Sequence, residues 1–249
     1  VFGVAGAVAL LFAGFSVQHS IGGISERQFG DIIHYDMIVA ENDRLLDKQK
    51  TEIDDQLKDD AVKESLGIHY EAMSKIAGDN KDTQEIKLIV PSENDQLKNY
   101  VTLENRHTGD SLKLPEEGVI ISERLAKLLN VQTGDTITLK DADNVSRKMK
   151  VSGITEMYMG HFVFTSKTGD ASIFGADYHT NAYLVNLENN SISNTEKQAA
   201  NFMNLTGVEG VVQNTTMINQ VHTIVNSLSK IMKVLIVIVK MMMDYFLLQ

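Results

Sequence analysis

The sequence of 249 residues contains no cysteine, which excludes disulfide bonds, thiolate metal sites and thiol nucleophiles. Basic residues are also few, because 23 Lys and Arg stand against 33 Asp and Glu, for a formal net charge of −10. Proteins bind nucleic acids through clusters of Lys and Arg, so this balance argues against a nucleic-acid partner. The hydrophobic fraction of 43% is sufficient for an ordinary core and argues against disorder.

The common catalytic motifs are missing as well. The sequence has no G-x-S-x-G elbow, no H-E-x-x-H pair and no G-x-x-x-x-G-K phosphate loop. Two histidines, His161 and His179, bracket Asp170 in a region predicted to be loop, and Asp177 lies there too. Such residues suit a metal, but solvated loop side chains are the simpler interpretation. We therefore expect this chain to be no enzyme and to hold neither a cofactor nor a metal.

Charge is absent from residues 1–25, which are rich in Val, Ala, Leu, Phe and Gly. At about 1.5 Å per residue, a helix of this length exceeds the roughly 30 Å hydrocarbon core of a bilayer. Gly3, Gly6 and Gly14 would allow a neighbouring helix to approach closely. A secretion signal is the alternative, but it requires a basic leader, and no Lys or Arg precedes Arg27. We expect a retained membrane span.

A second apolar segment lies near the other end of the sequence. Its apolar side chains recur every three or four residues, which predicts one stripe along a helix: Val221, Ile224, Val225, Leu228, Ile231, Met232, Leu235 and Ile238. Lys240 and Asp244 interrupt the segment that follows, and charges at mid-membrane depth are unfavourable. We expect an amphipathic stalk over 220–233 and a possible membrane entry from 234. The alternative is a helix that packs on a soluble core.

The sequence between these segments alternates strand and helix patterns. A buried strand is predicted at 36–40, a polar helix around Leu45, Ile53 and Leu57, and strands at 68–76 and 85–90. This order is β-α-β-β.

Further along, a strand at 182–185, a helix at 195–205 and a strand at 210–212 form a β-α-β unit.

A mainly β region separates these two halves. It is predicted to hold a hairpin, a short helix capped by Ser122 and two strands, at 100–114, 122–129, 136–139 and 147–154. Thr-Gly-Asp occurs three times, from Thr108, Thr133 and Thr168, and we interpret all three as turn or loop chemistry. The whole order predicts an α+β fold of two βαβ-type halves with a mainly β insertion, flanked by long helices.

Three stretches carry a family resemblance. They are QFGDIIHYD at 28–36, GVIISERLAKLL at 118–129 and GDTITL at 134–139, which follow an uncharged opening helix. In this order they resemble the extracytoplasmic domain of FtsX-like ABC transporter permeases, also called the MacB-like periplasmic core domain. The resemblance covers nearly the whole chain. It implies these divisions: a transmembrane and stalk helix at 1–28, halves of a porter-like lobe at 29–90 and 178–219, an inserted β-rich lobe at 91–177, and a second stalk at 220–249.

The resemblance also implies a function. Such a chain is a permease subunit in a bacterial cell membrane, with its main domain outside the cell, and the resemblance allows a permease dimer. A cytoplasmic ABC ATPase subunit hydrolyses ATP, and stalk helices couple that event to export or extraction of a peptide, lipoprotein or antibiotic, or to control of an outer protein partner. A ligand-sensing ectodomain of a membrane receptor is the alternative, and a secreted hydrolase is a third possibility without a positive motif.

Two sets of residues are candidates for these roles. We expect the coupling stalk to use the following apolar residues: Val221, Ile224, Val225, Leu228 and Ile231. A loop at 157–178 holds the candidate contacts to cargo or a partner: Met157, Tyr158, Met159, Phe162, Phe164 and Phe174. Met and aromatic side chains give adaptable apolar contact, although packing between the two lobes explains them equally well.

Overall fold

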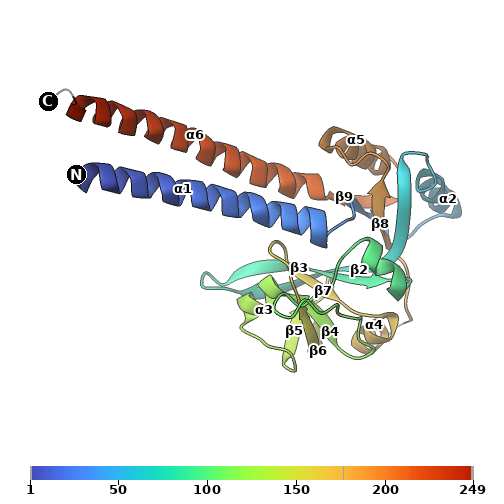
Figure 1. Ribbon diagram of the computed structural model, residues 1–249. Helices are drawn as coiled ribbons and strands as arrows, with labels where there is room; N and C mark the ends of the chain where they lie inside the picture. Colours follow the sequence, from blue (N-terminus) through green and yellow to red (C-terminus); the bar gives the residue numbers. More distant parts are fainter. Residues whose placement is uncertain (1, 176, 248–249) are drawn as a thin grey trace. The chain divides into compact units, whose positions relative to one another are not determined.

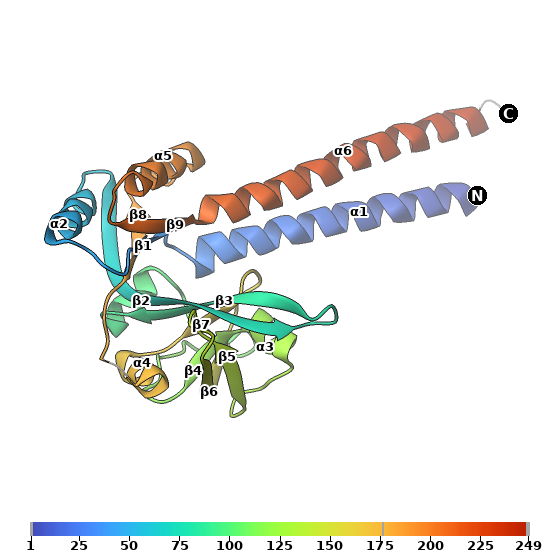
Figure 2. The same cartoon turned by 180° about the vertical axis from the view of Figure 1, so that it is seen from behind.

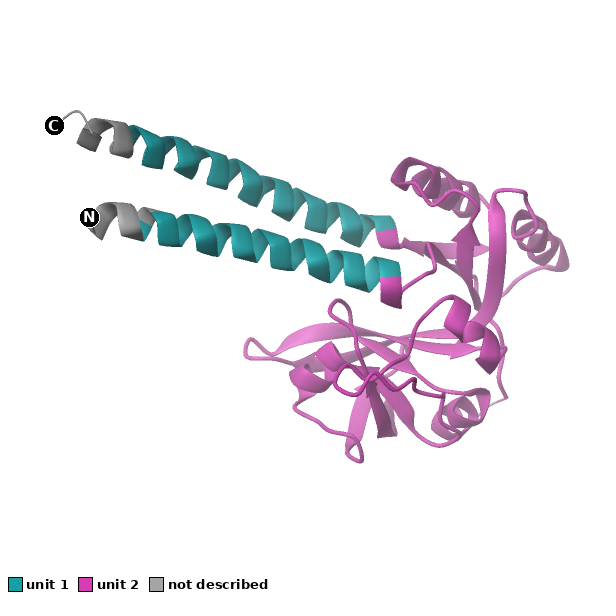
Figure 3. Cartoon of the chain, in the orientation of Figure 1, with its two compact units in different colours: residues 1–30, 215–249 teal, residues 31–214 magenta. Residues whose placement is uncertain are grey.

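The computed structural model describes residues 2–175 and 177–247, which leaves the extreme ends of the predicted flanking segments, Val1 and 248–249, outside the described residues. The chain divides into two compact units, coloured separately in Figure 3. Unit 1 comprises residues 1–30 and 215–249, and unit 2 comprises residues 31–214. Unit 1 is helical and unit 2 holds all the described strands. The two are described separately below.

Unit 1 is a pair of long helices that lie side by side (Figures 1 and 2). The first, α1, spans Phe2–Glu26 and continues as a π-helical segment, η1, over Arg27–Ile32. The second, α6, spans Asn214–Leu247. It continues as helix through Lys240, where the sequence left the course of the chain open.

One part of unit 2 is a four-stranded region of the sheet with two helices. Its elements are β1 (Met37–Glu41), α2 (Asp47–Gln56), β2 (Val62–Ala77), β8 (Ala182–Leu187), α5 (Ile192–Met203) and β9 (Val208–Gln213). The strand order is β2-β8-β1-β9, and all three neighbouring pairs are antiparallel. Thus the two halves predicted from sequence interleave, because β8 of the second half lies between β2 and β1 of the first.

The α2 and α5 helices cover one face of this region. Alternate strand residues point to that face, as the period of two in a strand requires. They form a core with apolar residues from both helices: Met37, Val39, Ile53, Tyr183, Val185, Leu187, Ala199, Phe202 and Val208. Because sequence-distant elements share this core, the two halves form one lobe.

The remaining strands form a small barrel with the end of β2. These elements are β3 (Asp82–Pro91), η2 (Asn94–Asn99), β4 (Val119–Ser122), α3 (Glu123–Leu129), β5 (Thr136–Lys140), β6 (Ser146–Thr155), β7 (Phe162–Phe164) and α4 (Lys167–Phe174). Strands pair in the order β3-β7-β4-β6-β5-β2, and β2 pairs with β3 to close the ring. The ring is joined less extensively at two places, because β7 pairs with three residues of β3 and β5 pairs with β2 through Ser74 and Lys140.

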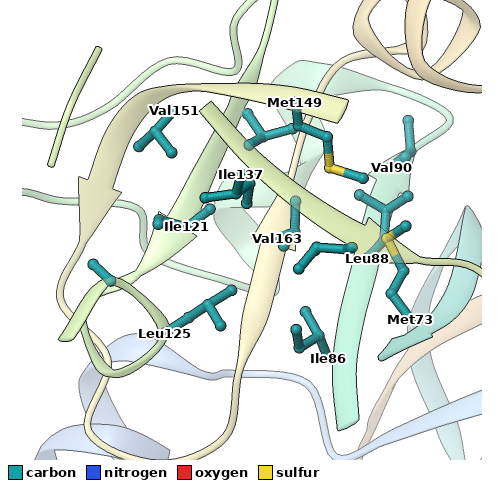
Figure 4. Close-up of a cluster of buried hydrophobic side chains, with 13 residues drawn as sticks. Met73, Ile86, Leu88, Val90, Ile121, Leu125, Ile137, Met149, Val151 and Val163 are labelled. Atoms are coloured by element: carbon teal, nitrogen blue, oxygen red, sulfur yellow. The ribbon is translucent and has the colours of Figure 1, made fainter. Parts of the chain in front are cut away.

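The barrel interior is filled with apolar side chains from all six strands (Figure 4). They include alternate residues such as Ile86, Leu88 and Val90 of β3, together with Leu125 of α3, and most are completely buried. The nine strands form a mixed sheet together with helices, so the predicted α+β class is confirmed. The sixteen-residue strand β2 serves both regions, because its start pairs with β8 and its end with β3.

Three local predictions were wrong. The third Thr-Gly-Asp is the first turn of α4, whose N-cap Ser166 accepts a bond from the Gly169 amide at 3.2 Å. The predicted hairpin around Gly109 contains no described strand, only a single antiparallel bridge between Glu104 and Ser111. Finally, the predicted contact loop contains both β7 and α4. Turn chemistry also fits the start of a helix, which explains the first error.

Ser122 caps α3 as predicted, and its role extends beyond the helix. Its completely buried hydroxyl accepts bonds from the amides of Leu125 and Phe162, at 3.4 and 3.1 Å. Ser122→Ala should therefore lower the free energy of unfolding by about 1–2 kcal/mol. Urea unfolding of the chain in detergent, followed by tyrosine fluorescence, measures this change.

Ser191→Ala provides the control for this substitution. Ser191 is the N-cap residue of α5, but its side chain makes no capping bond. Its replacement should change the free energy of unfolding by less than about 0.5 kcal/mol. Equal effects of the two substitutions would contradict the role assigned to the Ser122 hydroxyl.

Candidate functional site

The contact between α1 and α6 includes small and polar residues. The Gln18 side-chain amide donates to the Ser229 hydroxyl at 2.7 Å. A Cβ atom at Gly14 would overlap the terminal Sδ and Cε atoms of Met232, so a larger residue at this position would require the Met232 side chain to shift. Small residues and interhelical hydrogen bonds are typical of helix contacts inside membranes.

The side of α1 away from this contact is apolar. Its exposed residues include Val8, Leu10, Phe12, Phe15 and Val17. A helix in water presents polar residues on its outer side. Among the described residues, one segment, Val8–Ile32, is long and apolar enough to cross a membrane, and 6% of its most apolar window is buried. Its low burial distinguishes it from the core helix of a soluble protein.

The structure divides the predicted stalk stripe between two faces of α6. The less exposed apolar residues between 221 and 239 follow an alternating spacing of four and three: Val221, Val225, Leu228, Met232, Leu235 and Val239. This is the spacing of an antiparallel coiled-coil seam. The other predicted stalk residues, Ile224 and Ile231, are 50% and 56% exposed and lie outside the seam. Of the five predicted stalk residues, Val221, Val225 and Leu228 lie in the seam, and Ile224 and Ile231 face outward.

Both helices connect to neighbouring strands of unit 2. The segment after α1 leads into β1, α6 follows β9 directly, and β1 and β9 are paired over their length. Bonds from Asn214 reinforce this junction, since its amide donates to the Asp36 carbonyl at 3.0 Å and its side chain donates to the Tyr35 carbonyl. The two chain connections are thus held together by the sheet.

The candidate contact residues have different surroundings. Met157, Phe162 and Phe164 are at most 3% exposed, and the rings of Phe162 and Phe164 stack with centroids 6.0 Å apart. These three belong to the interior, in accordance with the packing alternative. Tyr158 and Met159 are half-buried, as is Phe174 on α4. The side chains accessible to a partner from the predicted set are therefore these last three.

Tyr158 lines a cleft of about 400 Å³ beside α3, which we call the α3 cleft. Glu123 on α3 accepts bonds there from Lys127 at 2.8 Å and from Arg106 at 3.3 Å. Burial alone would raise the pKa of Glu123, but these two bonds outweigh it and hold the pKa below its usual value. The guanidinium of Arg106 also lies over the Tyr158 ring, 4.9 Å from its centroid. Sequence reasoning missed this cluster, although the spacing of Glu123 and Lys127 is that of a helical ion pair.

His161 lines the same cleft. Its Nδ1 atom is buried and has no hydrogen-bond partner among the described residues. Burial and the nearby charge of Arg124 lower the pKa of His161. A buried nitrogen without a hydrogen bond is unfavourable, so the His161 ring is a site of incomplete hydrogen bonding beside the cleft.

The four residues considered for a metal are not brought together. Asp170 instead accepts a bond from Nδ1 of His69 at 2.9 Å, and the His179 ring lies 4.8 Å from the His69 ring. His161 lies in the α3 cleft. Within the described part of the chain, no group of three or more acidic, histidine or cysteine residues could hold a metal ion.

No protein-family model matches this chain, and no curated protein matches it either. Similar solved structures include the following two. One is the periplasmic region of MacB from Actinobacillus actinomycetemcomitans, with 11% identity, a TM-score of 0.36, and coverage of 76% of this chain and 92% of that one. The other is the extracellular domain of the noncanonic ABC-type transporter YknZ from Gram-positive bacteria, with 14% identity, a TM-score of 0.34, and coverage of 72% and 99%. With both TM-scores below 0.5, these similarities carry no argument about function.

Proposed function

We propose that this chain is the extracytoplasmic part of an ABC transporter permease subunit, with α1 in the membrane, the start of α6 as a stalk and unit 2 outside the membrane. The observation that supports this most strongly is the arrangement of the helix pair. Small and polar residues such as Gly14, Gln18 and Ser229 lie in the contact beside the apolar seam of α6, and apolar residues also cover the outward side of α1. An apolar outward side is favourable in lipid and unfavourable in water.

The stretches behind the family resemblance fit the proposed fold. Residues 118–129 form β4 and α3, and residues 134–139 lead into β5. Gly118 and Gly134 have positive φ angles of 83° and 100°, which side chains rarely adopt. Glycine at these two positions is therefore explained by backbone geometry, so the resemblance rests on the fold of this unit and not on catalytic residues.

The connections supply a mechanical path for coupling. A shift of α6 along α1 would move β9 against β1, because each helix is continuous with one of these paired strands. From β1 the displacement passes through β8 to β2, which runs on into the barrel. ATP hydrolysis by a separate cytoplasmic subunit would drive the shift, and the barrel would move its cargo or outer partner as a rigid body.

Crosslinking the helix pair tests this function. The absence of native cysteine allows Gln18→Cys and Ser229→Cys to be introduced together and joined by a short, reducible thiol crosslinker. The intact protein, isolated from its native membranes, should carry ATP hydrolysis by an associated subunit. Crosslinking should slow this hydrolysis by at least about tenfold, which corresponds to about 1.4 kcal/mol on the rate-limiting barrier. A reducing agent should restore the rate.

The two single-cysteine variants, treated with the same reagent, are the controls and should keep the rate of the native protein. If the isolated protein carries no ATP hydrolysis, the transporter assignment is wrong. If hydrolysis is present but the crosslink leaves its rate unchanged, coupling does not pass through the α1–α6 contact.

A further inference from the structure

The α3 cleft has an excess of positive charge in an otherwise acidic protein. Arg106, Arg124 and Lys127 line it, and Glu123 is the carboxylate among its lining residues. The chain as a whole has a formal charge of −10. In the adjoining hollow, which shares three of these residues, the Glu156 carboxylate accepts a bond from the Tyr158 hydroxyl. A positive cleft on an acidic surface concentrates anions locally.

The cations of the cleft differ in how far they are neutralised. Glu123 binds both Arg106 and Lys127, so these two side chains are held in fixed positions. Arg124 is the next residue on α3, and its guanidinium makes no hydrogen bond or ion pair within the described chain. Its charge acts on His161 across the cleft. One cation is thus left without a counter-charge beside a histidine with an unpaired nitrogen.

The walls of the cleft add apolar surface. Leu128 and Met157 line it together with the Tyr158 ring. Tyr158 is fixed on one side by its bond to Glu156 and covered by Arg106. An apolar wall beside a fixed polar group is typical of sites that bind small ligands or single side chains.

We propose that the α3 cleft binds a peptide carboxylate that lies next to an apolar or aromatic side chain. Arg124 contacts the carboxylate beside the His161 ring, and the side chain lies against Leu128 and Tyr158. Guanidinium and carboxylate form strong charge-assisted bonds, and the wall selects against ions without an apolar group. This inference rests on the proposed function and specifies the chemical group that the cargo or partner would present. Binding at the site does not depend on ATP hydrolysis.

Nuclear magnetic resonance of the histidine rings tests the proposal directly on the full chain in detergent micelles. The probe is N-acetylphenylalanine, whose free carboxylate lies beside an aromatic ring. It should shift the His161 ring signals in a saturable way and raise the pKa of that ring by about one unit, because an anion stabilises the charged form. The signals of the other six histidines should stay in place, which also shows that the fold is intact.

Arg124→Gln should weaken binding of this probe by at least about tenfold. The matched control is Arg44→Gln, which removes the same charge from an exposed position on the other region of unit 2. N-acetylphenylalanine amide, which lacks the carboxylate, should not bind. The proposal fails if the amide binds as well as the acid, if inorganic phosphate binds equally tightly, or if both arginine substitutions weaken binding to the same extent. Because these measurements do not involve ATP, failure here is distinct from failure of the crosslinking experiment.

Discussion

Asp170→Ala should lower the free energy of unfolding by about 2–4 kcal/mol, since it removes one partner of a buried polar pair. Asp170 and His69 are 3% and 5% exposed, and Nδ1 of the histidine lies 2.9 and 3.0 Å from the two carboxylate oxygens. The pair joins α4 to β2 across 101 residues of sequence. Its loss would leave the His69 ring nitrogen buried without an acceptor.

The surroundings of the pair make this loss severe. The rings of Phe174, Tyr178 and His179 lie 5.5, 6.5 and 4.8 Å from the His69 ring, measured between centroids. Aromatic neighbours exclude water, so no solvent replaces the missing carboxylate. Polar pairs in such surroundings are more strongly coupled than exposed ones.

Urea unfolding of three variants separates the contributions. Asp170→Asn keeps an acceptor oxygen and should cost less than the alanine substitution. Asp177→Ala removes an exposed carboxylate three residues beyond α4 and should change the free energy by less than about 0.5 kcal/mol. If Asp170→Ala and Asp177→Ala are equally mild, the His69–Asp170 pair does not anchor α4.

Local patterns in the sequence were sufficient to predict an element when its structure depends mainly on its own residues. The alternation at 136–139 and 147–154 predicts β5 and β6, and Ser122 marks the start of α3. Closure of the barrel was not accessible in this way. It depends on pairing of β2 with β3 and β5, together with a strand of three residues, β7, which is too short for a periodic signal.

In the candidate sites, too, features of a single segment were predicted and features that depend on contacts between segments were not. The apolar stripe of α6 was predicted, but its split into an inner seam and an outer row depends on α1, which presents Gly14 and Gln18 to the contact. The sequence of α6 alone contains no information on its partner. The α3 cleft combines Arg106, the α3 helix and His161, which the pairing of β4 with β7 brings together. Only the ion-pair spacing on α3 was visible beforehand.

Phe12→Asp should prevent much of the insertion of α1 into a membrane. Phe12 is 75% exposed near the middle of α1, so in water this substitution would change stability by less than about 0.5 kcal/mol. In lipid, an aspartate near the centre of a spanning helix raises the apparent free energy of insertion by about 2.5–3.5 kcal/mol. The substitution should therefore have little effect if Phe12 faces water and a large effect on insertion if Phe12 faces lipid.

Translation of the chain into microsomes measures the effect, because insertion of α1 carries unit 2 into the lumen. The exposed sequons at Asn144, Asn189 and Asn204 then become accessible to glycosylation, and the glycosylated fraction reports insertion. Leu46→Asp is the matched control, since Leu46 is 68% exposed on unit 2 and should leave glycosylation unchanged. A glycosylated fraction for Phe12→Asp equal to that of the native chain would mean that the apolar face of α1 does not contact lipid, and the membrane assignment would then be wrong.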